Sequence, residues 1–136
     1  MTDEPAEIGL LDTSVLVAAE GGRPLRAEAL PKSAAISIVT VGELRAGILA
    51  APDIQSRDRR LYTLERISGT AILSVDHRVA RTWAGMRAYL AASGKRVSGN
   101  DLWIAATAAA SEIPVITQDR DFNALSGVNG LTVIEV

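Results

Sequence analysis

Short apolar runs alternate with longer helix-like segments along this chain, and this alternation constrains its fold more than any other feature. The apolar runs predict strands over 8–11, 34–38, 71–73, 115–117 and 131–134. The segments between them predict helices over 14–19, 41–50, 56–67, 78–92 and 102–111. Alternating strands and helices are typical of parallel βαβ units. The sequence therefore predicts an α/β fold with a central parallel sheet of four to five strands flanked by helices.

The chain length favours a single domain. Its 136 residues fall within the usual size of one domain, which buries about two-thirds of the surface exposed by the unfolded chain. There is no linker rich in Gly, Ser or Pro and no internal repeat. We therefore expect one domain over 1–136, with residues 1–7 as a flexible N-terminal extension.

Several function classes are excluded by composition. The chain has no cysteine, which rules out disulfides, thiolate zinc sites and cysteine nucleophiles. The acidic N-terminus does not resemble a secretory signal, and no apolar run approaches the roughly 18 residues that a membrane span needs. His77 is the only histidine, and the chain has no G-x-S-x-G motif that would support a Ser-His-Asp hydrolase. We therefore expect a cytoplasmic protein without thiol or triad chemistry.

Four acidic residues follow or precede predicted elements at positions that a parallel sheet brings to one edge. They are Asp12, Glu43, Asp101 and Asp119. Ligands of open parallel sheets bind beyond the carboxyl ends of the strands. Two carboxylates about 4 Å apart repel each other by about 4 kcal/mol at an effective dielectric constant near 20. A hard divalent cation, Mg²⁺ or Mn²⁺, would relieve this repulsion.

Each acid also has a purely structural interpretation. Asp12 could cap the helix that follows it, and Thr40 with Glu43 forms a T-x-x-E capping box. Asn100 or Asp101 could cap the next helix, and Asp119 stands where Asx turns are common. Capping does not predict that all four acids meet at one edge, and a carboxylate has enough lone pairs to cap a helix and bind a metal.

Four segments of the chain together resemble the PIN-domain nucleases, and among them the VapC toxins of bacterial toxin–antitoxin pairs. They are Leu10–Val17, Thr40–Gly47, Asn100–Ala108 and Val115–Phe122. Their order and spacing fit across nearly the whole chain. The resemblance implies a single PIN-like domain.

The resemblance also implies the roles of individual residues. Asp12, Glu43, Asp101 and Asp119 become catalytic, metal-binding acids for Mg²⁺, with Mn²⁺ as a possible substitute. Asp121 resembles a further metal ligand. Thr13, Ser14 and Thr117 stand where the family places hydroxyls around the metal.

The expected function follows from the same resemblance. It is metal-dependent endoribonuclease activity of a toxin that cleaves structured cellular RNA, tRNA or rRNA, and so inhibits translation. The expected partners are a VapB-type antitoxin and a second copy of the chain in a homodimer, with no membrane. The alternative is a non-catalytic PIN-fold protein that binds RNA or a partner chain. Such a protein would be expected to lack one or more of the four acids, and all four are present here.

Basic side chains supply the candidate contacts to RNA phosphates. Twelve of the fourteen basic residues are arginine, whose guanidinium group matches phosphate oxygens. The candidate substrate-binding residues are Arg57, Arg59, Arg60 and Arg66 in one predicted helix, and Lys95 and Arg96 in the turn over 93–100. The alternative for the helix is a solvated charged face.

Overall fold

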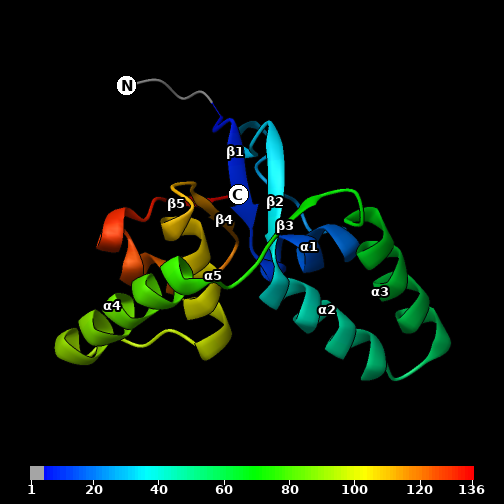
Figure 1. Ribbon diagram of the computed structural model, residues 1–136. Helices are drawn as coiled ribbons and strands as arrows, with labels where there is room; N and C mark the ends of the chain where they lie inside the picture. The colour runs from blue at the N-terminus through cyan, green and yellow to red at the C-terminus, as the bar shows by residue number, and fades with distance from the viewer. Residues whose placement is uncertain (1–4) are drawn as a thin grey trace.

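The chain forms a five-stranded parallel sheet between two groups of helices. The computed structural model describes residues 5–136. The strands are β1 (Ile8–Leu11), β2 (Ser33–Ser37), β3 (Ala71–Leu73), β4 (Val115–Thr117) and β5 (Val133–Glu135), in the order β3-β2-β1-β4-β5. The longer helices are α1 (Thr13–Glu20), α2 (Ile38–Leu49), α3 (Ile54–Arg66), α4 (His77–Ser93) and α5 (Gly99–Ala110) (Figure 1). The short 3-10 helices are η1 (Ala27–Ala29), η2 (Arg120–Leu125) and η3 (Val128–Gly130). The expected α/β architecture is confirmed.

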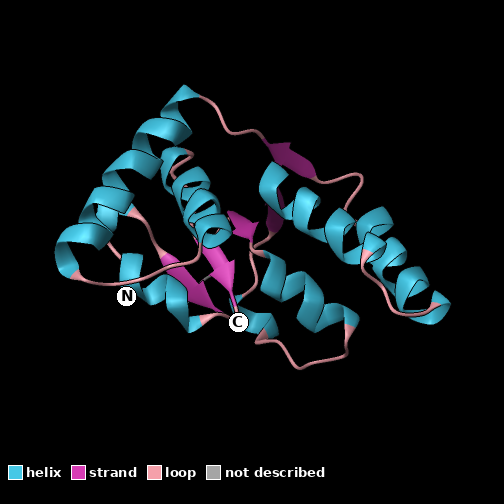
Figure 2. Ribbon diagram, turned by 90° about the horizontal axis from the view of Figure 1, so that it is seen from below, coloured by secondary structure: helices cyan, strands magenta, loops and turns pink. Residues whose placement is uncertain are grey.

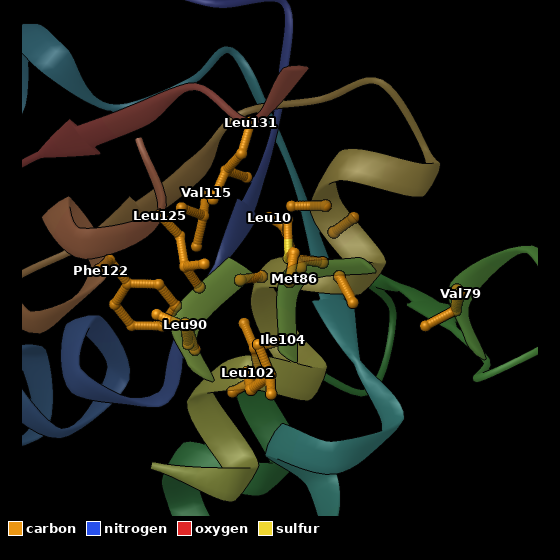
Figure 3. Packing of buried hydrophobic residues seen from close by; sticks show 14 residues of the cluster. Leu10, Val79, Met86, Leu90, Leu102, Ile104, Val115, Phe122, Leu125 and Leu131 are labelled. Atoms are coloured by element: carbon orange, nitrogen blue, oxygen red, sulfur yellow. The ribbon is translucent and has the colours of Figure 1, made fainter. Parts of the chain in front are cut away.

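Side chains alternate between the two faces of the sheet and divide the core in two. Leu10 and Val115 join a large cluster with Met86 of α4 and Ile104 of α5 (Figure 3). Ile36 packs on the opposite face, with side chains from α1, α2 and the end of α3. Figure 2 shows the strands between these helices in a view from below. This alternation is the two-residue period of a strand buried on both faces.

Two helices begin earlier in the structure than the sequence predicted, so two of the capping interpretations are wrong. Helix α2 begins at Ile38, and its N-cap is Ser37, whose hydroxyl accepts a hydrogen bond from Val39 N at 3.1 Å. Thr40 and Glu43 therefore lie inside the helix, and the predicted capping box is wrong. Helix α5 begins at Gly99 with Ser98 as its N-cap. In both cases a serine nearer the preceding segment satisfies the free amide groups of the first turn.

The last strand also differs from its prediction. It covers Val133–Glu135 instead of 131–134 because the Leu131 side chain is buried at the end of η3. Leu131 N donates to Val128 O at 3.0 Å, which keeps this residue in the preceding turn.

Part of the expected N-terminal extension lies outside the described residues, namely residues 1–4. Of the remainder, Ala6 O accepts from Lys32 N at 2.9 Å and Glu7 O accepts from Ser33 N at 2.8 Å. These bonds place residues 6 and 7 beside the start of β2. A flexible extension over 1–7 stays a prediction. Within the described part of the chain, no helix is long and apolar enough to cross a membrane.

The strand order creates a switch point between β1 and β4. From β1 the chain builds the sheet through β2 and β3 on one side, and it then crosses over to β4 and β5 on the other. Helices that leave neighbouring strands in opposite directions open a crevice at the carboxyl ends of those strands. In Figure 1, the carboxyl ends of β1 and β2 point to the same end of the molecule, where α2 begins.

Candidate metal centre

Asp12 is buried at the switch point, directly after β1. Its side chain is 2% exposed, and it caps α1 by accepting a hydrogen bond from Ser14 N. Its other carboxylate oxygen accepts a hydrogen bond from the Thr117 hydroxyl at the end of β4. Burial raises the pKa of Asp12, and these hydrogen bonds oppose that rise. Capping and a fixed orientation of the carboxylate therefore occur together.

Asp119 lies across the crevice, two residues after Thr117. Its backbone N donates to the Thr117 hydroxyl at 2.8 Å. Its carboxylate caps η2 by accepting from Asp121 N at 2.9 Å, which is the expected Asx-type turn. The charge of Asp119 contributes to the raised pKa of Asp12. Asp121 contacts this group through its backbone, and its side chain is exposed.

Glu43 reaches the same region from the middle of α2. The Thr13 hydroxyl donates to its Oε1 at 2.6 Å and lies 3.0 Å from the Thr40 hydroxyl. Asn100 Nδ2 donates to its Oε2 at 3.3 Å. Residues from α1 and α5 therefore hold one carboxylate oxygen each, which limits the rotation of this glutamate.

Asp101 is in the first turn of α5, where its backbone N donates to Ser98 Oγ at 3.2 Å. Burial raises the pKa of Asp101 to about 6, and the negative charges of Asp12, Asp119 and Glu43 act in the same direction. The negative charges of the other three acids therefore make the Asp101 carboxyl group harder to ionise. The fold brings four carboxylates separated in sequence into one electrostatically coupled group.

The chemistry of this group fits a hard divalent cation. Its donors are carboxylate oxygens, with hydroxyls of Thr13, Ser14 and Thr117 around them. Over residues 5–136, no three Asp, Glu or His side chains are already close enough together to hold an ion. Mg²⁺ is compatible with this spacing because it usually keeps several waters and takes only one or two carboxylates directly. The spacing does not suit a closed cage made of protein ligands alone.

Ser14 and Gln118 tie the two sides of the crevice together. Ser14 Oγ accepts from Gln118 N at 2.9 Å and lies 3.4 Å from Thr117 Oγ1. Gln118 Nε2 donates to the carbonyl of Val136 at 2.7 Å. Sequence patterns did not identify Gln118 or the contact between Asn100 and Glu43, because their partners are distant in sequence. The position of Asn100 directly before Asp101 is the only local signal.

The predicted substrate-binding residues lie on two separate elements. Four are on α3, where Arg59 donates to Ser56 Oγ at 3.2 Å and Arg60 donates to Gly47 O. The Arg66 guanidinium lies 5.8 Å from the centre of the Tyr62 ring, and Arg57 is exposed. Lys95 and Arg96 are exposed in the turn between α4 and α5. The structure therefore does not gather all six basic residues into one patch.

Comparison with known proteins identifies relatives over the full chain. A family model described as PIN domain matches residues 9–128. Ribonuclease VapC5 of Mycobacterium tuberculosis is 49% identical over 136 residues, which are 100% of both chains. Ribonuclease VapC4 of the same organism is 38% identical over 124 residues, 91% of this chain and 95% of the relative.

A solved structure shows the same likeness. A chain in the crystal structure of VapBC-5, a member of the VapBC family of toxin–antitoxin systems from Mycobacterium tuberculosis, matches with a TM-score of 0.90. It is 47% identical, and the match covers 96% of this chain and 99% of that chain.

Proposed function

This chain belongs to the PIN domain family, and we propose that it is the toxin ribonuclease of a VapBC-type toxin–antitoxin pair. The full-length likeness to two VapC ribonucleases supports this assignment. The observation that carries it is that the Thr117 hydroxyl bonds to both the Asp12 carboxylate and the Asp119 backbone N at the switch point of the sheet. In the same crevice Asn100, the neighbour of Asp101, donates to the Glu43 carboxylate. A protein that had lost the reaction would not need to keep four like charges in this crevice.

Asp12, Glu43, Asp101 and Asp119 are the residues that would hold Mg²⁺ or Mn²⁺, and Asp121 could add a ligand through water. When bound, such a cation would polarise water and offset negative charge on the phosphate oxygens. Thr13, Asn100 and Thr117 keep two of the carboxylates oriented. Groups that orient ligands in this way typically change metal affinity or activity by about 10- to 100-fold.

Without a bound cation, burial and the neighbouring carboxylates raise the pKa of Asp101 to about 6. A bound cation would lower this pKa again, so Asp101 in the loaded site would be an ionised carboxylate that holds the cation or one of its waters. Attack by water on the scissile phosphodiester would leave a 5′-phosphate and a 3′-hydroxyl. This reaction does not involve the RNA 2′-hydroxyl, so the proposed substrate class, structured tRNA or rRNA, rests on the relatives' ribonuclease names and on the resemblance.

The proposed partner is a VapB-type antitoxin that covers apolar surface on α1, α2 and α3. Leu49 is 83% exposed and Ile54 is 77% exposed at the junction of α2 and α3. Val17 of α1 and Tyr62 of α3 are also exposed. Between α1 and α3 lies a mostly apolar cavity of about 290 Å³. Large exposed apolar side chains that gather on neighbouring helices are typical of a surface that a partner covers. A homodimer is proposed from the resemblance.

The test is cleavage of a mixed pool of structured RNA by purified protein free of antitoxin. Reactions contain Mg²⁺, Mn²⁺ or EDTA, and Asp12→Asn protein purified in parallel controls for contaminating nucleases. We expect cuts that require metal, disappear in the variant and carry 5′-phosphates. Metal-independent cuts, or cuts retained in the variant, would contradict the proposed site. RNA binding without any cleavage would favour the non-catalytic alternative.

A further inference from the structure

The segment from α4 to the start of α5 carries only positive charge. Between Asp76 and Asp101 the sequence contains no acidic residue. The same stretch contains Arg78, Arg81, Arg87, Lys95 and Arg96. Helix α3, in contrast, carries Asp58 and Glu65 among its arginines. The charge of the whole chain is −2, whereas this uniformly basic segment attracts polyanions locally.

A cavity of about 290 Å³ lies at the end of this segment, under the turn between α4 and α5. Leu90, Val97 and Leu102 form apolar walls. Leu90 and Leu102 are almost fully buried, so packing in the core fixes the positions of these two side chains. Arg87, Lys95 and Arg96 line the same cavity, and none of the described residues that line it is acidic.

Two of the basic side chains are oriented by aromatic rings. The Arg87 guanidinium lies 5.6 Å from the centre of the Trp83 ring, which is itself stacked on Trp103 at 4.7 Å. Lys95 Nζ lies 5.6 Å from the centre of the Tyr89 ring and 3.3 Å from its hydroxyl. Charges held in place lose less conformational entropy when a ligand binds. The cavity is therefore a partly preorganised site for a ligand with an apolar face and a negative charge.

We propose that this cavity is a nucleotide subsite that takes an unpaired nucleotide of the RNA substrate. The apolar walls would contact the face of the base, and the basic residues would contact its flanking phosphates, as in other sites for single-stranded nucleic acid. The proposal rests on the ribonuclease function proposed above. Leu102 of the cavity directly follows Asp101, and Ser98 of the same turn binds Asp101 N. A nucleotide held here would thus contact the turn that leads into the proposed metal site, and it would help to select the phosphodiester that is cleaved.

The first test measures RNA binding in EDTA, so that it does not depend on cleavage. A short fluorescein-labelled single-stranded RNA of mixed sequence is titrated with native protein, with Lys95→Gln/Arg96→Gln, and with the matched control Arg23→Gln/Arg26→Gln. Both double variants remove two exposed charges. We expect the cavity variant to weaken binding about tenfold at low salt. The slope of log affinity against log salt should fall by about 0.7 per lost phosphate contact, and the control should change neither quantity.

A second variant separates a cavity from a merely basic surface. Ala91 lines the cavity from α4 and is exposed, so Ala91→Leu fills the space without changing charge or disturbing the helix. We expect this variant also to weaken binding of the single strand, with less effect on a blunt RNA duplex. Ala88→Leu, at another exposed alanine of α4, is the control. Circular dichroism confirms that each variant is folded.

The possible results separate this inference from the proposed function. The proposed nucleotide subsite would be overturned by an equal loss of RNA affinity in both double variants, or by unchanged RNA affinity of Ala91→Leu. This holds even if metal-dependent cleavage is observed. A change of oligomeric mass in the cavity variants would assign the surface to a second copy of the chain and also overturn it. If native protein binds as expected but cleaves no RNA, the ribonuclease proposal fails and the binding result stands. No RNA binding by native protein would overturn the subsite.

Discussion

Thr117 donates a hydrogen bond from its buried hydroxyl to the buried carboxylate of Asp12, across 105 residues of sequence. The bond joins the ends of β1 and β4, which are neighbours in the sheet. The same hydroxyl accepts from Asp119 N at 2.8 Å. One side chain therefore connects the two acids on either side of the switch point.

Thr117→Val should reduce both stability and cleavage. The substitution keeps the shape of the side chain but leaves a buried carboxylate and a backbone N–H without this partner, a loss that typically costs about 1–3 kcal/mol. We expect a lower free energy of urea unfolding and a 10- to 100-fold slower cleavage. The control is Thr107→Val, which removes another buried hydroxyl, bonded to Trp103 O at 2.8 Å. It should lose stability without a specific loss of cleavage, and equal cleavage by both variants would contradict this role of Thr117.

Asn100→Ala should slow cleavage with little change in stability. The amide of Asn100 holds Glu43 Oε2 from another helix, and loss of such an orienting bond typically costs about tenfold or more in activity or metal affinity. Cleavage rates measured over a series of Mn²⁺ concentrations will show whether metal affinity or the maximal rate changes. Asn123→Ala removes a comparable exposed bond to Glu135 at 3.1 Å and should cleave normally. Similar losses of cleavage rate in Asn100→Ala and Asn123→Ala would show that the effect comes from a general loosening of the fold.

Metal-free protein should lose stability as pH rises from about 4 to above 6. The Asp101 carboxyl has a pKa of about 6 in the fold, against an ordinary value of 3.8 for aspartate, so the folded state binds its proton more tightly and stability falls with pH across this window. Asp12 contributes in the same direction. Asp101→Asn should flatten this pH dependence and raise stability at pH 7 by about 1 kcal/mol, after allowance for solvent screening.

The measurement is urea unfolding in EDTA between pH 4 and pH 8. The opposite trend applies to Asp53 and Asp76, whose pKa values are lowered by backbone hydrogen bonds at helix N-termini. Their contribution is present above about pH 4 and is lost as pH falls further. Added Mg²⁺ or Mn²⁺ should stabilise native protein more at pH 7 than at pH 5, because cations and protons compete for the same carboxylates. A cation effect that is independent of pH would contradict binding at these acids.

Asp12→Asn should abolish cleavage while leaving α1 intact. Asparagine caps helices about as well as aspartate. Its neutral side chain also avoids the free-energy cost of burying a negative charge, and this burial is what raises the pKa of Asp12. We expect unfolding stability equal to or above that of native protein. Asp12→Ala should also lose cleavage, but it should be about 1 kcal/mol less stable because the cap to Ser14 N is lost. Equal stability of the two variants would show that the cap contributes little.

Much of the fold could be predicted because strands and helices follow local patterns. The runs at Ile8–Leu11 and Val115–Thr117 are apolar over nearly their whole length, as expected for strands covered on both faces. Local patterns failed at the start of α2, where T-x-x-E suggested a cap. Both Ser37 and Thr40 can cap a helix, and the choice depends on where β2 ends against its neighbours. That information is not local.

The sequence by itself determined the α/β class, the order of the elements and the positions of Asp12 and Asp119 after their strands, because these follow from the periodicity of apolar residues and the direction of parallel strands. Only the tertiary structure decided which groups meet. The bonds of Thr117 to Asp12 and of Asn100 to Glu43 span 105 and 57 residues. The basic cavity likewise depends on how α4 packs on α5. Such contacts are set by side-chain packing across the sheet, and close packing depends on the shapes of all the neighbours at once.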